Sequence, residues 1–307
     1  MVRRKNVLQA LKRSDGGFII VAVLWILIGL ATLTSVYAVY VVNVAFAVGA
    51  NDDQIQSEEL TRAAVELAAY QLTRFAIADR PTSGETKFRM GGATVTVSFR
   101  TENARIDLNL APKELLSNFF VGLGAGREQA DDFAERIVGW RTKPQPGTAD
   151  NEASLYRAAG KKYGPREGPF PHPDELWLVL GLPPNLVRRA EPYLTVYGLD
   201  PKINVVEAPP QVLAALPGMN PEELGNLLAM RGATQGSKDT LLQMLGPAQI
   251  MATVQGSKAV RLKIAVRFDN GRQTNSEIVI TINDEPLQPY HILYWRDGFD
   301  QAASNVG

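Results

Sequence analysis

The sequence contains no cysteine and only two histidines, His172 and His291. The absence of cysteine excludes thiol catalysis, cysteine metal sites and disulfides, and it leaves the redox compartment open. Two histidines offer little material for metal binding or for acid–base chemistry near neutral pH. His172 lies between two prolines and His291 lies among C-terminal aromatic residues, so we interpret both as structural.

Common enzyme motifs are also absent. The sequence has no G-x-S-x-G elbow, no P-loop and no H-E-x-x-H pattern. The glycine-rich segment 122–126 lacks the spacing of a dinucleotide-binding loop. We therefore expect a protein that is not an enzyme and requires no cofactor. A membrane-tethered enzyme is the least favoured of three alternatives.

The chain has no excess of charge of either sign. Lys+Arg and Asp+Glu each total 32 among 307 residues, so the formal net charge is zero. No overall field therefore favours nucleic acid or an anionic membrane surface. A hydrophobic content of 45% is typical of a folded chain rather than a disordered one. The length predicts about two domains.

An uncharged, mostly apolar run extends from Phe18 to Ala50 and follows a basic segment, residues 1–13. It exceeds the roughly 20 residues that cross a bilayer, and the basic flank predicts a cytoplasmic N-terminus. We therefore predict a single-pass membrane protein whose bulk is exported. A location in the inner membrane, with the bulk in the periplasm, is what the pilin resemblance described next implies. Two alternatives are a plain anchor and a secretory signal peptide cut near Ala47, although such a peptide has a much shorter apolar core.

The junction at residues 14–18, Ser-Asp-Gly-Gly-Phe, resembles a prepilin cleavage site. The resemblance implies that a prepilin peptidase cuts between Gly17 and Phe18 and that the new N-terminal Phe18 is methylated. Most pilins carry Glu at the fifth mature position, where it is thought to pair with the terminal amine of a neighbouring subunit; here that position is Ala22. An unpaired carboxylate in apolar surroundings is costly. A subunit at the tip has no neighbour above it, so Ala22 favours a tip subunit.

Helical and strand patterns follow the membrane segment. An apolar stripe at helical spacing predicts that the helix continues to about Ala78; its members are Leu60, Ala64, Ala68, Leu72 and Phe75. Apolar residues alternate with polar ones over residues 94–100, 260–268 and 278–282. Asn270-Gly271 lies between the last two segments and predicts a β-hairpin. The sheet is thus split in sequence around a long helical stretch.

We therefore predict an α+β fold: a pilin-like long N-terminal helix packed on an antiparallel sheet, with a large, mostly α-helical inserted domain. The expected boundaries are 1–17 for a prepilin-type leader, 18–50 for the transmembrane half of the helix, 51–105 and 255–307 for the helix-and-sheet domain, and 106–254 for the insert.

The insert contains an internal repeat, because residues 106–112 resemble residues 203–209. Each copy predicts a strand, an Ala-Pro helix start, a glycine turn and a second helix, an order similar to the helix-hairpin-helix element. DNA-binding versions hold a phosphate on the turn N–H groups, with nearby cations. Residues 106–142 and 203–231 each carry two more acids than bases, which favours a structural or protein-contact role. A membrane-anchored DNA receptor stays the second alternative.

Taken together, these features resemble the protein K family of type II secretion minor pseudopilins. A middle block also resembles the family, in Trp140, residues 149–152 with Tyr156, and Pro173–Leu176. The resemblance implies a tip complex with the minor pseudopilins I and J, on a filament of the major pseudopilin that moves folded proteins toward an outer-membrane secretin. A minor pilin of a type IV pilus is a related alternative that the sequence separates poorly.

Loops in the middle block can hold calcium in that family, where acids follow the tryptophan. Here Trp140 is followed by Arg141-Thr142-Lys143, so those acids are missing. Calcium prefers six to eight oxygen ligands, and Asp150 and Glu152 are the remaining candidates. We favour a solvated acidic turn over a calcium site.

Overall fold

In a computed structural model of the chain, the described residues are 16–144, 151–232, 238–283 and 288–298. By their internal contacts the residues fall into two compact units, Met1–Glu58 and Glu59–Gly307. Helix α1 (Gly16–Thr73) contributes its first part to one unit and its last part to the other.

In the first unit, α1 presents apolar side chains to solvent. Residues Ile19–Val44 have a mean hydropathy of 2.5, and their most apolar window is 0% buried by protein. Thr32, Thr34 and Ser35 donate their hydroxyls to backbone carbonyls three or four residues earlier, at 2.7–2.9 Å. A helix that is apolar all round and satisfies its own polar groups suits a lipid environment. This helix fits a single-pass anchor.

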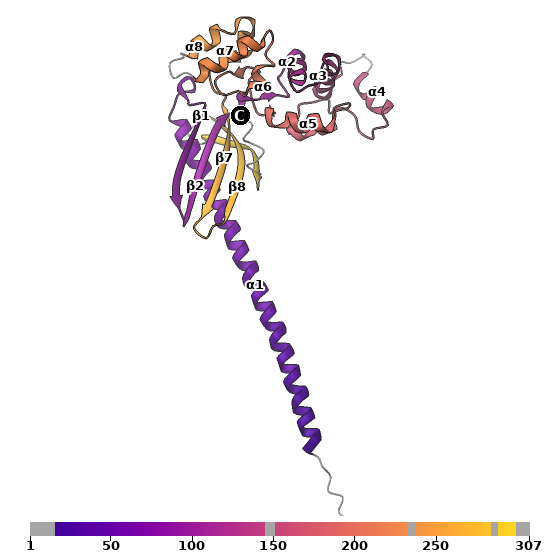
Figure 1. The fold of residues 1–307 in the computed structure, drawn as a ribbon, viewed down its shortest axis with the longest axis vertical. Coiled ribbons are helices and arrows are strands. Elements are labelled where there is room, and N and C mark those ends of the chain that lie inside the picture. Colours follow the sequence, from indigo (N-terminus) through magenta and orange to yellow (C-terminus); the bar gives the residue numbers. More distant parts are fainter. Residues whose placement is uncertain (1–15, 145–150, 233–237, 284–287, 299–307) are drawn as a thin grey trace, which may run out of the picture. The chain divides into compact units, whose positions relative to one another are not determined.

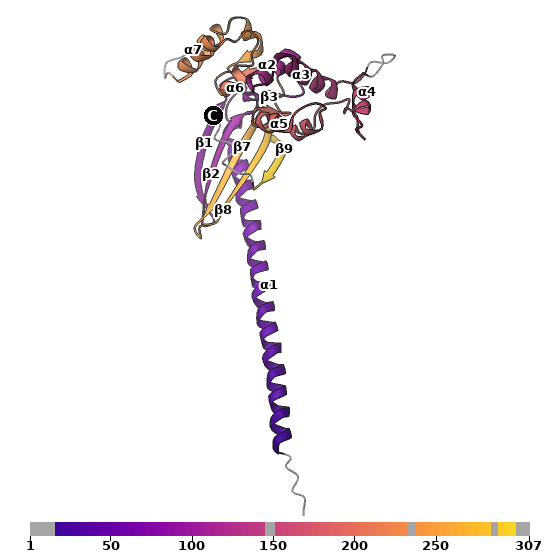
Figure 2. The same cartoon turned by 45° about the vertical axis from the view of Figure 1, so that its right-hand side comes forward.

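The second unit is built on a five-stranded antiparallel sheet in the order β1-β2-β7-β8-β9. The strands are β1 (Ser83–Met90), β2 (Ala93–Thr101), β7 (Ala259–Phe268), β8 (Gln273–Ile282) and β9 (Tyr290–Asp297). Figure 1 shows β1, β2, β7 and β8 side by side, and Figure 2 shows β9 beyond β8. The central pair, β2 and β7, is therefore formed by segments on either side of the insert in sequence.

One face of this sheet packs against the last part of α1. The buried helix residues include Leu60, Ala64, Ala68 and Leu72, as the apolar stripe predicts. The prediction that the helix continues to about Ala78, with Phe75 in its apolar stripe, is wrong. Helix α1 ends at Thr73, and the Phe75 side chain is 46% exposed. The apolar residues of β2, β7 and β8 complete the same core.

The predicted hairpin at Asn270-Gly271 is confirmed. Strands β7 and β8 pair from Ala259↔Thr281 to Arg267↔Gln273. Gly271 has φ +88°, a left-handed conformation that glycine adopts without the steric cost other residues meet. Its N–H donates to the carbonyl of Phe268 at 3.0 Å, which closes the turn.

The insert between β2 and β7 is mostly helical. Its α-helices are α2 (Lys113–Gly122), α3 (Arg127–Arg141), α4 (Asn151–Ala158), α5 (Pro184–Ala190), α6 (Pro210–Leu213), α7 (Pro221–Gly232) and α8 (Lys238–Gln243). Its 3-10 helices are η2 (Glu102–Ala104), η3 (Pro173–Leu178), η4 (Glu191–Tyr193) and η5 (Gly246–Met251), and its short strands are β3 (Ile106–Asp107), β4 (Leu194–Thr195), β5 (Ile203–Asn204) and β6 (Ala252–Thr253). The insert has an apolar core of its own, distinct from that of the helix and sheet. The predicted fold class is thus confirmed.

Candidate functional site

The predicted processing site lies at the start of α1. Gly17 and Phe18 are in its first turn and Ala22 lies one turn further on. The side chains of residues 16–18 are outside the described set. Cleavage and methylation at this site, and the meaning of Ala22, therefore stay predictions.

The first repeat of the insert closes with a short parallel strand pair. β3 pairs with β4, and the N–H of Leu108 donates to the carbonyl of Thr195 at 2.8 Å. The carboxylate of Asp107 accepts from the N–H groups of Asn109 and Gly198, both at 2.7 Å. Burial raises the pKa of Asp107, and these backbone bonds oppose that rise. Asp107 therefore joins the segment that follows β3 to the segment that follows β4, at the two ends of the first repeat.

The second repeat closes in the same way. β5 pairs in parallel with β6, and the N–H of Val205 donates to the carbonyl of Thr253 at 2.9 Å. Asn204 occupies the position of Asp107 in the first copy. Its side-chain oxygen accepts from the N–H of Val206 at 3.0 Å, and its side-chain nitrogen donates to the backbone carbonyl of Gln255. The repeat therefore extends beyond the helices to a closing strand, which our sequence comparison missed. The Thr-Val pair shared by 195–196 and 253–254 is the signal for it.

An arginine at the end of the second helix holds the loop of each repeat. Arg141 donates to the carbonyls of Leu108 and Ala111, the latter at 2.6 Å. Arg231 donates to the carbonyl of Ala208, also at 2.6 Å. Burial lowers the pKa of both arginines. Each arginine therefore serves its own repeat rather than an external anion.

The hairpin turns of the repeats use their N–H groups internally. The N–H groups of Leu123, Gly124 and Ala125 donate to carbonyls of α2 at 2.8–3.0 Å. In the second copy the N–H of Met219 donates to Leu216 at 3.0 Å. A DNA-binding turn keeps such groups for phosphate, so this geometry supports the structural interpretation.

The first repeat carries an addition between its second helix and the closing strand. Residues 142–183 lie between α3 and α5, whereas only residues 233–237 lie between α7 and α8. Trp140 packs in this block with the rings of Tyr156, Tyr163 and Phe170 at centroid distances of 5.8–6.5 Å. Trp140 and Tyr156 of the middle block recognised in the sequence thus belong to an aromatic cluster that packs this addition against α3.

A buried ion-pair network lies where the sheet meets the insert. Arg261 on β7 donates to both carboxylate oxygens of Glu102 in η2, at 2.6 and 3.0 Å. Its third nitrogen lies 3.4 Å from Glu277 on β8, whose other oxygen accepts from Arg296 at 2.9 Å. Thr195 donates its hydroxyl to Glu102. The alternation of apolar and polar residues in the sequence predicts that Arg261 lies on the polar face of its strand. It does not predict that Arg261 pairs with Glu102.

Aromatic contacts join β9 to the insert and to α1. The ring of Tyr294 lies 5.2 Å from that of His172 and 6.1 Å from that of Tyr197. Tyr290 donates its hydroxyl to Glu66 on α1 at 2.7 Å. Tyr290 thus joins β9 to α1, and Tyr294 joins it to the insert. His172 also accepts from the N–H of Asp174 at 3.1 Å, a role in local structure.

The residues around Glu152 fit a calcium ion poorly. Glu152 accepts from Arg136 at 2.6 Å, and both side chains are largely buried. Gly139 permits this approach, because a Cβ there would lie 2.7 Å from the carboxylate carbon of Glu152. Asp150 lies outside the described residues, within which no group of three or more His, Cys, Asp or Glu residues could hold a metal. Calcium binding stays untested.

These features define a pilin-like fold class: an apolar N-terminal helix, a helix-on-sheet core and a helical domain inserted between two neighbouring strands. Comparison with known proteins narrows the class. Residues 100–199, which include the whole first repeat, match the family model described as type II secretion system (T2SS), protein K.

The fold is similar to a chain in the crystal structure of the GspK-GspI-GspJ complex from the enterotoxigenic Escherichia coli type 2 secretion system. The TM-score is 0.61 at 16% sequence identity, and the match covers 82% of this chain and 99% of the other. No curated protein matches the chain. The family match and the shared fold support the prediction of a minor pseudopilin of the protein K type, and they favour neither a DNA receptor nor a type IV pilin.

Proposed function

We propose that the chain is a minor pseudopilin at the tip of a type II secretion pseudopilus, and that it is a structural subunit rather than an enzyme. The observation that carries this is the family match, which covers the first repeat. That repeat is inserted between two strands of a sheet that packs on the last part of a long N-terminal helix. A domain inserted between β2 and β7 adds bulk to one side of a pilin core. A bulky insert suits an end position, where no subunit packs above.

The proposed partners are the minor pseudopilins I and J, the major pseudopilin and a prepilin peptidase. The crystal structure of similar fold contains GspI and GspJ, which supports the first two. In the second unit the exposed face of α1 includes Tyr70, whose side chain is 63% exposed. We expect this face to contact the helices of the partners.

Co-purification in detergent tests the proposal. The tagged full chain is co-expressed with the I and J proteins of its own system, and the three are expected to elute as one complex. Tyr70→Arg is expected to weaken the complex, while Met90→Arg at an exposed hairpin position is the matched control. Failure of the folded wild-type chain to retain either partner would contradict the proposed function. An intact complex with Tyr70→Arg would reject only the contact through α1.

A further inference from the structure

A cavity lies between the sheet face that turns away from α1 and the first repeat of the insert. Its volume is about 680 Å³. Part of its lining is a row of polar residues that are paired across the five strands: Glu85, Ser98, Lys263, Glu277 and Arg296. Nothing in the proposed function uses this cavity.

The two buried carboxylates of the cavity are already neutralised. Both oxygens of Glu102 accept from Arg261. One oxygen of Glu277 lies near Arg261 and the other accepts from Arg296. The other cations near them, Arg105 and Lys263, act on these carboxylates only through longer-range attraction.

Two cations in the lining are left over, Arg105 and Lys263. Within the described part of the chain neither side chain makes a hydrogen bond or an ion pair within 4.0 Å, although both are half-buried. Burial, followed by repulsion from Arg261, lowers the pKa of Arg105 to about 10. Burial, followed by repulsion from Arg105, lowers the pKa of Lys263. Bound negative charge would relieve both effects.

The rest of the cavity indicates what carries that charge. Its walls include Tyr193, Tyr197 and Pro192, and its size far exceeds that of a single small ion. Its lining also includes the carboxylates of Glu85, Asp174 and Glu191, so a ligand with a single negative charge meets less repulsion than a multiply charged one such as free phosphate. Aromatic and proline walls suit a peptide body.

We propose that this cavity binds an acidic side chain on a segment of a partner protein, with Arg105 and Lys263 as the counter-ions of its carboxylate. Two fixed donors at one carboxylate give charge-assisted hydrogen bonds, and the low surrounding dielectric strengthens them. The inference does not depend on the proposed function, because it concerns binding to the isolated chain.

Calorimetric titration of the full chain in a non-ionic detergent tests this. The probes are a capped tetrapeptide with one central glutamate, the same peptide with glutamine, and inorganic phosphate. We expect saturable binding of the glutamate peptide and at least about tenfold weaker binding of the glutamine peptide and of phosphate. Lys263→Gln and Arg105→Gln are each expected to weaken the glutamate peptide by about tenfold or more.

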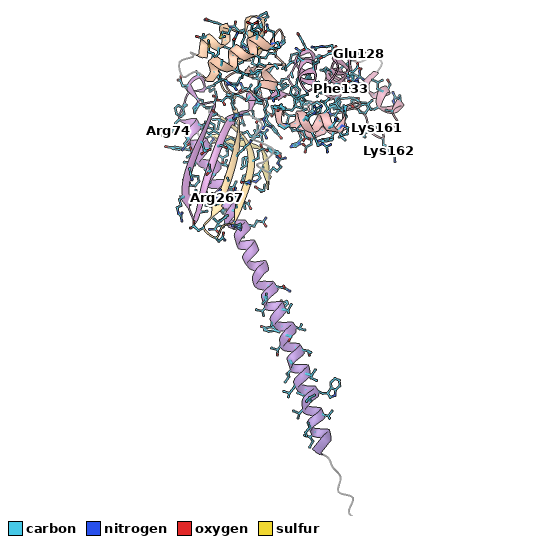
Figure 3. The ribbon with its side chains drawn as sticks, in the orientation of Figure 1. Arg74, Glu128, Phe133, Lys161, Lys162 and Arg267 are labelled. Atoms are coloured by element: carbon cyan, nitrogen blue, oxygen red, sulfur yellow. The ribbon has the colours of Figure 1, made fainter. Side chains whose placement is uncertain are left out.

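Two variants on the same sheet face serve as controls. Lys87→Gln on β1 and Arg267→Gln on β7 remove exposed cations outside the cavity, and Figure 3 shows Arg267 near the turn that joins β7 to β8. Both are expected to leave binding unchanged. Arg105→Lys keeps the positive charge and is expected to retain binding. It takes the place of Arg105→Gln in the comparison if that variant does not fold.

Three outcomes would overturn the proposal. One is the absence of saturable binding up to about 5 mM glutamate peptide. The second is equal binding of the glutamate and glutamine peptides, which would remove the carboxylate from recognition. The third is tighter binding of phosphate than of peptide, which would make the cavity a site for free anions.

Discussion

Arg261 holds both carboxylate oxygens of Glu102, although the two residues lie far apart in sequence. Arg261 is on β7, which follows the insert, and Glu102 is in η2, which precedes it. The exposed fractions are 9% for the Arg261 side chain and 1% for the Glu102 side chain. This pair therefore ties together the two points at which the chain leaves and rejoins the sheet.

Arg261→Met is expected to destabilise the chain strongly. It leaves the Glu102 carboxylate buried without its main counter-ion, and removal of one member of a buried pair typically costs about 3–5 kcal/mol. Thermal unfolding followed by circular dichroism would show a lower midpoint. Arg89→Met is the matched control, because Arg89 and Asp269 form an exposed pair and such pairs contribute about 0–1 kcal/mol. Equal shifts for the two variants would contradict the role assigned to Arg261.

The stability that comes from this pair should be lost in acid. Burial alone would raise the pKa of Glu102, but Arg261 and Arg105 outweigh that effect and lower it below its usual value of 4.5. A lowered pKa stabilises the fold above the unfolded pKa, and that gain disappears as pH falls through the folded value. The stability difference between wild type and Glu102→Gln should therefore shrink as the pH falls below 4.5, the usual value for this carboxyl. A difference that stays constant over this range would contradict the assignment.

The two loop-holding arginines should behave alike. Arg141→Lys and Arg231→Lys each remove donors from buried or half-buried carbonyls, which typically costs about 1–3 kcal/mol. Hydrogen exchange should speed up at Leu108 and Ala111 in the first variant and at Ala208 in the second. Arg188→Lys on the exposed face of α5 is the control and should change stability by less than about 0.5 kcal/mol. Faster exchange in both repeats after either substitution would contradict the claim that each arginine stabilises only its own repeat.

Calcium should not stabilise the chain. Arg136 already supplies positive charge to Glu152 at 2.6 Å, so a bound cation would have to displace it. We expect the thermal midpoint to be the same in a chelator and in excess calcium, and to fall in Arg136→Ala. A midpoint that rises with calcium would show that Asp150 and Glu152 form a site after all.

Local patterns predicted much of this fold. Alternation and the Asn270-Gly271 turn fixed the β7–β8 hairpin, because side-chain period and turn conformation are short-range properties. The stripe from Leu60 to Leu72 predicted the buried face of α1 for the same reason. The repeat was visible because both copies keep the Ala-Pro helix start, at Ala111 and Ala208.

Long-range contacts could not be predicted in this way. The end of α1 before Phe75 depends on how the chain turns toward β1, and the pairing of Glu102 with Arg261 depends on the return of the chain after the insert. That Arg105 and Lys263 have no direct ion pair among the described residues is apparent only once the carboxylates around them have been placed. Sequence spacing contains none of this information.

The central claim is that the chain follows the prepilin route, and the mature N-terminus tests it most directly. The full chain is co-expressed with a prepilin peptidase, and intact mass and N-terminal sequencing are then measured. The account predicts a chain that begins at a methylated Phe18, and it predicts that Gly17→Val blocks this cleavage. A wild-type chain that still begins at Met1, or one cut near Ala47, would contradict it.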